Sequence, residues 1–225
     1  MPDINTKKHT MLKLQKCAKA LSANNMETFI ASTKEEAREI AKTLLADCTT
    51  VTMGGSMSAF ECGIPQMLSE GDFTFYNRNR EGITPDEVQE IYRKAFTCDA
   101  YISSSNAITQ NGELYNVDGN SNRVAAMLFG SKKLIVIAGC NKIVANIDEA
   151  IARVRHTAAP ANCLRLGLDN YCTHTGSCMA CENTDVDMAS GCNADSRICC
   201  NYVVMAHQRQ KDRVKVILVA EELGY

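Results

Sequence analysis

The chain has 225 residues, 45% of them hydrophobic, and its 24 Lys and Arg residues nearly balance 26 Asp and Glu residues. A chain of this length buries most of its apolar surface without covalent staples, and without a basic excess we expect no nucleic-acid partner. The N-terminus lacks the apolar core of a secretion signal and no apolar run reaches the roughly 18 residues of a membrane span, so we expect a cytoplasmic protein without membrane contact.

The first half of the chain alternates helices and strands. Apolar residues at helical spacing predict an N-terminal helix within residues 1–24, and Thr33 with Glu36 forms a capping box that begins a second helix. Pro85 after Thr84 begins a third helix. Strands are predicted at 26–31, 49–53, 72–76 and 100–104.

The second half continues the alternation and then loses it. Strands are predicted at 113–117 and 133–139, and helices at 122–130 and 146–160, the last ending at Pro160. The continuous apolar run at 133–139 indicates a strand buried on both faces. A final strand begins near residue 213. We therefore predict a single α/β domain over residues 1–225, with a mostly parallel sheet covered on both faces and an insertion at 161–200.

Seven of the twelve cysteines lie in this insertion. In a reducing compartment such clustering indicates metal binding rather than disulfides. One C-x-x-C pair, an earlier cysteine and a later one predict the metal-ligand set Cys172, Cys178, Cys181 and Cys199. Further possible ligands, here called the reserve positions, are Cys163, His174, Cys192 and Cys200. Four thiolates suit a [4Fe-4S] cluster or zinc; the alternative is that the cysteines are buried as small apolar residues.

Polar residues that follow the predicted strands form a candidate ligand site. In a parallel sheet, ligands bind at the carboxyl ends of the strands. The glycine-bearing loops after the strands at 49–53 and 133–139 supply the candidates Gly54, Gly55, Ser56 and Ser58 and the candidates Gly139, Asn141 and Lys142. The loop between 104 and 123 adds Ser104, Asn106, Thr109, Glu113, Asp118, Asn122 and Arg123. Arg123 and Lys142 would hold an anion; the alternative is that these residues only form turns and that Arg123 pairs with Asp118 or Glu113.

The runs "VTMGGSMSAFECGI" and "SSNAITQNGELYNVDGNSNRVAAMLFGSKKLIVIAGCNKIV" resemble the LUD domain family of lactate-utilisation proteins B and C, in a cysteine-bearing branch. The resemblance covers roughly residues 10–225. It implies a three-layer α/β fold similar to the sugar-phosphate isomerase and coenzyme A transferase group. Related coenzyme A transferases use a nucleophilic glutamate where this chain has Gln110, and an amide cannot take that role.

The resemblance also implies a role in oxidising lactate, or a similar 2-hydroxy acid, to the 2-oxo acid. The chain would be an accessory or electron-transfer component beside iron-sulfur partner proteins, with a bound small anion or nucleotide and a homo-oligomer as a further expectation. The preference for an iron-sulfur cluster over zinc rests on this resemblance. Two alternatives stay open: a non-redox anion- or nucleotide-binding module with structural zinc, and an isomerase or hydrolase acting on a phosphorylated small molecule.

Overall fold

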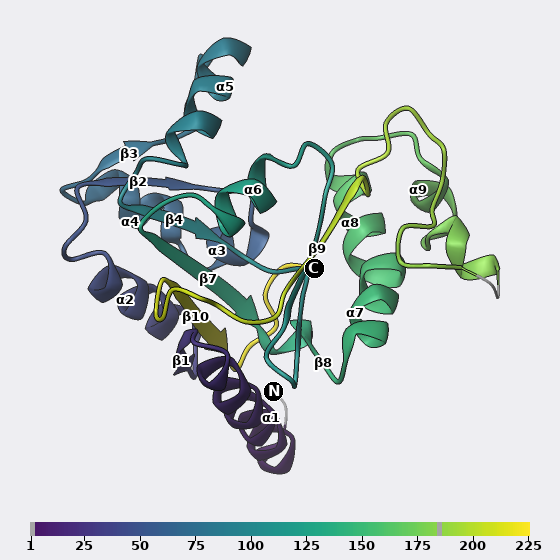
Figure 1. Ribbon diagram of the computed structural model, residues 1–225, viewed down its shortest axis with the longest axis horizontal. Helices are drawn as coiled ribbons and strands as arrows, with labels where there is room; N and C mark the ends of the chain where they lie inside the picture. The colour runs from purple at the N-terminus through teal and green to yellow at the C-terminus, as the bar shows by residue number, and fades with distance from the viewer. Residues whose placement is uncertain (1–2, 184–185) are drawn as a thin grey trace.

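The computed structural model describes residues 3–183 and 186–225, and within them the centre is a sheet of six parallel strands in the order β1-β10-β7-β4-β2-β3 (Figure 1). The strands are β1 (Glu27–Ala31), β2 (Thr50–Met53), β3 (Thr74–Tyr76), β4 (Ala100–Ser103), β7 (Lys133–Gly139) and β10 (Val214–Val219). β7 and β10 lie side by side, with Ile137 opposite Ile217. The predicted α/β fold with a mostly parallel sheet is confirmed.

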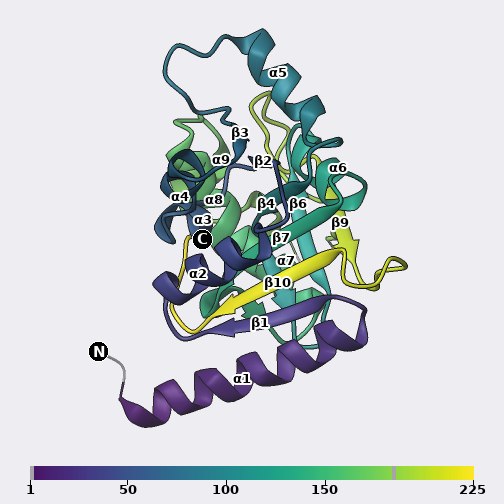
Figure 2. The ribbon, with the colours of Figure 1, turned by 90° about the vertical axis from the view of Figure 1, so that its left-hand side faces the viewer.

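Helices cover both faces of this sheet. On one face lie α2 (Lys34–Leu44), α3 (Met57–Glu61) and α4 (Ile64–Glu70), which pack on Ile135 and Ile217. On the other face lie α1 (Ile4–Ala23) and α6 (Asn122–Leu128), which pack on Leu134 and Val216. Figure 2 shows α1 running beside β1. The first two residues of the helix expected within 1–24 lie outside the described residues.

Helix α5 (Pro85–Lys94) extends away from the sheet edge (Figure 1). Its start follows the predicted pattern, because Thr84 and Glu87 form a capping box and Pro85 occupies the first turn. Only Ile91 is buried within the helix. No helix within the described ranges has the length and apolar character that a bilayer crossing requires.

A second, smaller sheet lies behind α1 and α6, in the order β8-β5-β6-β9. Its strands are β5 (Ala107–Thr109), β6 (Leu114–Asp118), β8 (Ile143–Val144) and β9 (Asn201–Met205). One side packs Ile108 and Leu114 into the core under the main sheet, and the other packs Tyr115 against Ala150 and Val154. The sequence predicted only β6 of these strands: β5 and β8 have three and two residues, too few to show alternation, and the five-residue β9 directly follows the segment in which the pattern is lost.

Residues 147–183 and 186–200 are here called the cysteine lobe, in which a group of short helices and a following irregular segment lie beside the second sheet (Figure 1). The lobe begins with α7 (Ile147–Arg153), continues through a wide π turn (Val154–Ala158) into α8 (Ala159–Arg165), and then forms α9 (Tyr171–Thr175) and a 3-10 turn (Met179–Glu182). The predicted helix end at Pro160 is wrong. A proline lacks the N–H that the helix would use, and the wide turn just before it lets the helical path continue.

The expectation of an unpatterned insertion at 161–200 is also wrong in part. Most of α8, α9 and the 3-10 turn fall inside it, and residues 184–185 of it lie outside the described residues. The short helices were missed because five to seven residues hold too few turns to show an apolar period.

Candidate functional site

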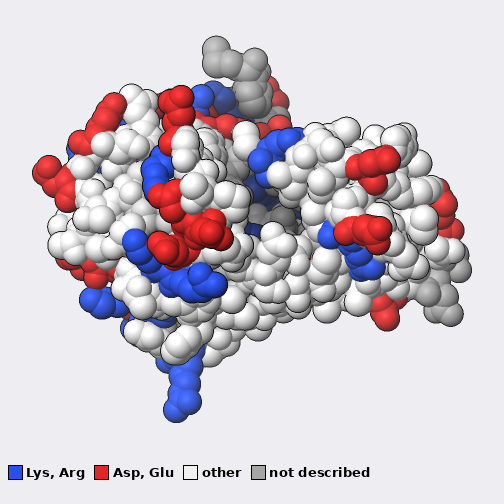
Figure 3. Space-filling view, turned by 90° about the horizontal axis from the view of Figure 1, so that it is seen from above, with Lys and Arg blue, Asp and Glu red and all other residues white. Residues whose placement is uncertain are grey.

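A cavity of about 720 Å³ lies between the strand ends of the main sheet and the cysteine lobe. Gly55 and Ser56 reach it from the end of β2, Ser104 from the end of β4, and Lys142 from the 3-10 turn after β7 (Cys140–Lys142). The lobe closes the other side with residues 195–199 and part of α8. From above the molecule, Figure 3 shows a hollow with Lys and Arg atoms around it. The cavity therefore has the position at which parallel sheets bind ligands.

The structure brings eight of the fourteen predicted ligand residues to this cavity. The eight are Gly55, Ser56, Ser104, Asn106, Asp118, Asn122, Arg123 and Lys142. The other six, Gly54, Ser58, Thr109, Glu113, Gly139 and Asn141, lie outside its lining. Thr109 and Glu113 bond each other across a turn, with Thr109 Oγ1 donating to Glu113 Oε2 at 2.5 Å. Asn141 holds the last residues of the chain, since its Nδ2 donates to the carbonyl of Gly224 at 2.9 Å.

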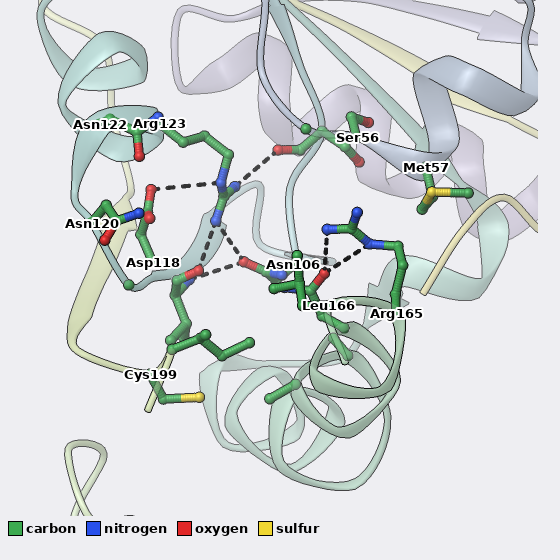
Figure 4. Close-up of a pocket in the computed structure, with 18 of the residues that line it drawn as sticks. Ser56, Met57, Asn106, Asp118, Asn120, Asn122, Arg123, Arg165, Leu166 and Cys199 are labelled. Carbon is green, nitrogen blue, oxygen red and sulfur yellow. Dashed lines mark hydrogen bonds and ion pairs between the residues drawn. The ribbon is translucent and has the colours of Figure 1, made fainter. Parts of the chain in front are cut away.

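Arg123 lies in the cavity wall, with its guanidinium committed to protein acceptors. It donates to Asn106 Oδ1 at 3.0 Å (Figure 4), to Asn116 Oδ1 at 2.6 Å and to the carbonyl of Val117 at 2.7 Å. Its Nε lies 3.7 Å from Asp118 Oδ2, so the ion pair named as the alternative is present. Burial lowers the pKa of Arg123 while Asp118 raises it. This side chain fixes the wall of the cavity.

Lys142 is almost completely buried, with 4% of its surface exposed. Its Nζ lies 3.2 Å from Ser104 Oγ, and in the described part of the chain no carboxylate lies within ion-pair distance. Burial, together with the smaller effect of the positive charges of Arg153 and Arg123, lowers the pKa of Lys142 to about 7. Near neutral pH the amine is therefore available in its uncharged form.

Among the residues that the structure describes, Arg78 Nε and the Tyr225 hydroxyl are polar atoms of the cavity lining that are buried without a hydrogen-bond partner. Arg78 Nη1 donates to the Tyr92 hydroxyl at 3.0 Å, and the guanidinium lies over the Tyr92 ring. A Cβ at Gly55 would collide with Nη2 of Arg78, so any other residue there would require the end of the Arg78 side chain to shift. Buried polar groups are normally satisfied, and these two atoms are suited to meet a ligand.

The lining as a whole carries an excess of positive charge. Its basic residues are Arg78, Arg123, Lys142, Arg165 and Arg197, and its acidic residues are Asp118 and Asp195. Sequence reasoning missed Arg78, Arg165, Arg197 and Tyr225. Arg78 could have been found, because it follows the strand β3 as Ser104 follows β4. The other three come from segments with no strand pattern or from the last residue.

The thiols of the cysteine lobe gather near one another. Burial, together with the smaller effect of the nearby thiols of Cys178, Cys163 and Cys172, raises the pKa of Cys199 to about 12. Burial likewise raises the pKa of Cys172 to about 12, with Cys163 and Cys192 adding to it. The predicted ligands Cys172, Cys178, Cys181 and Cys199 thus share one region. Even so, no three His, Cys, Asp or Glu side chains among the described residues are arranged to hold a metal ion.

The reserve positions lie in different settings. His174 Nε2 contacts Asp169 Oδ1 at 2.6 Å on the surface. Cys200 is exposed, and Cys163 accepts a hydrogen bond from Asn170 Nδ2 at 3.3 Å.

Arg197 organises the loop that carries the last cysteines. It donates to the carbonyls of Cys199 at 2.7 Å, Cys192 at 2.8 Å and Ala189 at 2.8 Å. Its Nη2 also donates to the Tyr202 hydroxyl at 3.0 Å. One guanidinium therefore ties the loop to β9, next to the point where Cys199 reaches the cavity.

Comparison with known proteins gives one clear result. A sequence model of the LUD domain matches residues 14–219. A crystal structure of a DUF162 family protein from Deinococcus radiodurans is similar over 95% of this chain and 98% of that chain, with 11% identity and a TM-score of 0.49. Comparison with curated proteins gives no match. Because the domain match covers most of the chain, this protein belongs to the LUD domain family.

Proposed function

We propose that this protein takes part in the oxidation of lactate, or a similar 2-hydroxy acid, to the 2-oxo acid, as an accessory component that binds an anionic small molecule in the cavity. Membership of the LUD domain family supports the metabolic setting. The observation that carries the proposal is the cavity itself, where basic residues outnumber acidic ones and the buried Nε of Arg78 has no hydrogen-bond partner within residues 3–183 and 186–225. A carboxylate or phosphate would supply that partner.

The size of the cavity favours a second candidate. Pockets of about 300–1,000 Å³ hold ligands of drug size, and a three-carbon acid would fill only a small part of 720 Å³. A nucleotide or another phosphorylated small molecule would fit the volume and the charge together. The alternatives of a nucleotide-binding module, or of an isomerase or hydrolase acting on a phosphorylated molecule, both require such a ligand.

Calorimetric titration with two matched pairs of compounds tests the proposal. Lactate is compared with its neutral amide, lactamide, and AMP with its neutral parent, adenosine. We expect the charged member of at least one pair to bind and its neutral partner to bind at least about tenfold more weakly. Binding of lactate supports the 2-hydroxy acid role, and binding of AMP alone supports the second candidate. Equal binding within both pairs, or none at all, contradicts the anion site.

Metal binding in the cysteine lobe is a separate proposal: a [4Fe-4S] cluster, or alternatively zinc, held by Cys172, Cys178, Cys181 and Cys199. Their thiols gather in one region and have the donor chemistry that either metal prefers. Their arrangement in the described residues does not fit a metal site, so binding would require the thiols to move. We therefore assign no electron-transfer step to the lobe.

Elemental analysis with a visible absorbance spectrum, on protein purified without oxygen, tests the metal proposal. Iron and sulfide in equal amounts, with a broad absorbance that bleaches on reduction, would identify the cluster and support a redox role beside iron-sulfur partner proteins. Zinc without colour would identify a structural site. Protein that contains neither metal contradicts the proposal.

A further inference from the structure

Ser104 and Lys142 meet at the wall of the cavity because two neighbouring strands end there. β4 and β7 pair in parallel. Ser104 directly follows β4, and Lys142 ends the short turn that follows β7. The Lys142 Nζ lies 3.2 Å from the Ser104 Oγ, and both residues line the cavity. A hydroxyl and an amine are therefore held in contact at an enclosed surface that a ligand can reach.

Neither side chain has the contacts of a purely structural residue. The hydroxyl of the neighbouring Ser105 donates to the carbonyl of Ala107 at 2.8 Å and spans a turn. The other contacts of the Ser104 hydroxyl are long, at 3.4 Å to the carbonyl of Ser105 and 3.5 Å to Ser58 Oγ. Lys133, a partly buried lysine, contacts both a carbonyl and the carboxylate of Asp47. Lys142 has the Ser104 hydroxyl as its hydrogen-bond partner among the described residues.

The surroundings favour an uncharged amine at position 142. The side chain is removed from water, and the charges of Arg153 and Arg123 disfavour its protonated form, while the carboxylate of Glu61 acts in the opposite direction with a smaller effect. Both arginines are tied to protein acceptors, Arg153 through the carbonyls of Asn141 and Asn106. A desolvated amine beside fixed positive charges loses its proton near neutral pH, and it can then accept one from a hydroxyl.

We propose that Ser104 is a nucleophile and Lys142 its general base, and that together they catalyse acyl transfer from an ester or thioester that also carries a negative charge. The Ser104 Oγ attacks the carbonyl carbon while Lys142 Nζ takes the hydroxyl proton. The C–O or C–S bond to the leaving group then breaks, and the leaving group receives that proton. Water attacks the resulting ester on Ser104 by the same route and releases the acid.

The charge of the cavity selects the substrate class. Arg78 and Arg165 line the same space as the Ser104 hydroxyl, so an acyl ester with a carboxylate or phosphate is favoured over a neutral one. This activity goes beyond the proposed role in 2-hydroxy acid oxidation and does not depend on lactate as a ligand. Sequence reasoning did not reveal the pair, because Ser104 and Lys142 are 38 positions apart.

The test uses the whole protein with the anionic ester 4-nitrophenyl hydrogen succinate and, as a neutral comparison, 4-nitrophenyl acetate. We expect a burst of nitrophenol with the anionic ester and a succinyl group on Ser104 in peptide mapping by mass spectrometry. The rate should rise with pH through about 7, because the base must be uncharged. A succinyl group on a cysteine or another lysine, with none on Ser104, would overturn the proposal.

Variants distinguish a loss of catalysis from a loss of folding. Ser104→Ala and Lys142→Arg should lose about a hundredfold or more in rate, because an arginine keeps the positive charge but cannot act as a base. Ser104→Cys should retain the burst, since a thiol can replace the hydroxyl. Ser131→Ala and Lys211→Met, which lie outside the cavity lining, should match the wild type. If Ser104→Ala and Lys142→Arg are folded by circular dichroism and keep the wild-type rate, the proposal is wrong; if they do not fold, the mapped acyl position in the wild type decides.

Discussion

The two walls of the cavity are held in different ways. The strand side is fixed by buried contacts, with Arg123 bonded to three acceptors within a packed sheet edge. The lobe side includes a loop whose carbonyls are bonded by Arg197 in partly buried and exposed positions. This difference predicts different local stabilities for the two walls. The strand wall should open only when the whole domain unfolds, whereas the lobe wall should open by local unfolding.

The largest expected effect is at Arg123. Replacing it by Met removes the charged donor that Asn106, Asn116 and the Val117 carbonyl share, and leaves Asp118 without its cation. We expect the free energy of unfolding to fall by about 3–5 kcal/mol. Urea denaturation followed by circular dichroism measures this. A loss below about 1 kcal/mol would show that the strand wall is not held by this side chain.

A large effect of opposite sign is expected at Lys142. Its pKa in the folded chain, about 7, lies below the ordinary lysine value of 10.5. Between pH 7 and pH 10.5 this lysine binds more protons in the unfolded chain than in the folded chain. It therefore lowers the free energy of unfolding at pH 7, and this destabilisation decreases as the pH rises toward 10.5. Lys142→Met should therefore be more stable than the wild type at about pH 7 by a few kcal/mol, with the gap nearly closed at about pH 10.

Urea midpoints of the two proteins at about pH 7 and about pH 10 give the comparison. The other titrating groups are common to both chains, so the difference between them isolates Lys142. A gap that stays constant with pH would show that the lysine remains charged in the folded protein.

A smaller, local effect is expected at Arg197. Arg197→Gln removes three carbonyl contacts from the loop that carries Cys192 and Cys199, and should lower the local stability by about 1–2 kcal/mol. Hydrogen exchange should speed up in residues 189–200 and stay unchanged in β7 and β10. Arg209→Gln, an exposed change in the connection between β9 and β10, is the matched control. Equal exchange in both variants would show that the lobe wall has another anchor.

The main sheet could be predicted from the sequence, because a long apolar run such as residues 133–139 indicates a strand that is buried on both faces. Of the second sheet only β6 could be predicted, since β5 and β8 have only three and two residues. In the lobe, the wide turn before Pro160 could not be predicted. Its residues Val154 and Ala158 pack against β6, and this tertiary contact has no signal in the sequence.

The candidate site was predictable where it follows strand ends. Ser104, Asn106 and Lys142 all reach the cavity for that reason. Arg123 also reaches it, but the sequence does not show that its guanidinium is used by Asn106 and Asn116 of the protein itself. Arg165 and Arg197 come from the lobe, whose position against the sheet has no signature in the chain.

The central claim is that the cavity binds an anion through Arg78, and a pair of variants tests it most directly. Arg78→Gln removes the side chain with the unpartnered Nε. Arg80→Gln, two residues away, removes only an exposed ion pair with Glu87. In calorimetric titrations with lactate and AMP, we predict that the anion bound by the wild type binds Arg78→Gln about tenfold or more weakly, and Arg80→Gln unchanged. Wild-type affinity in Arg78→Gln would contradict the claim.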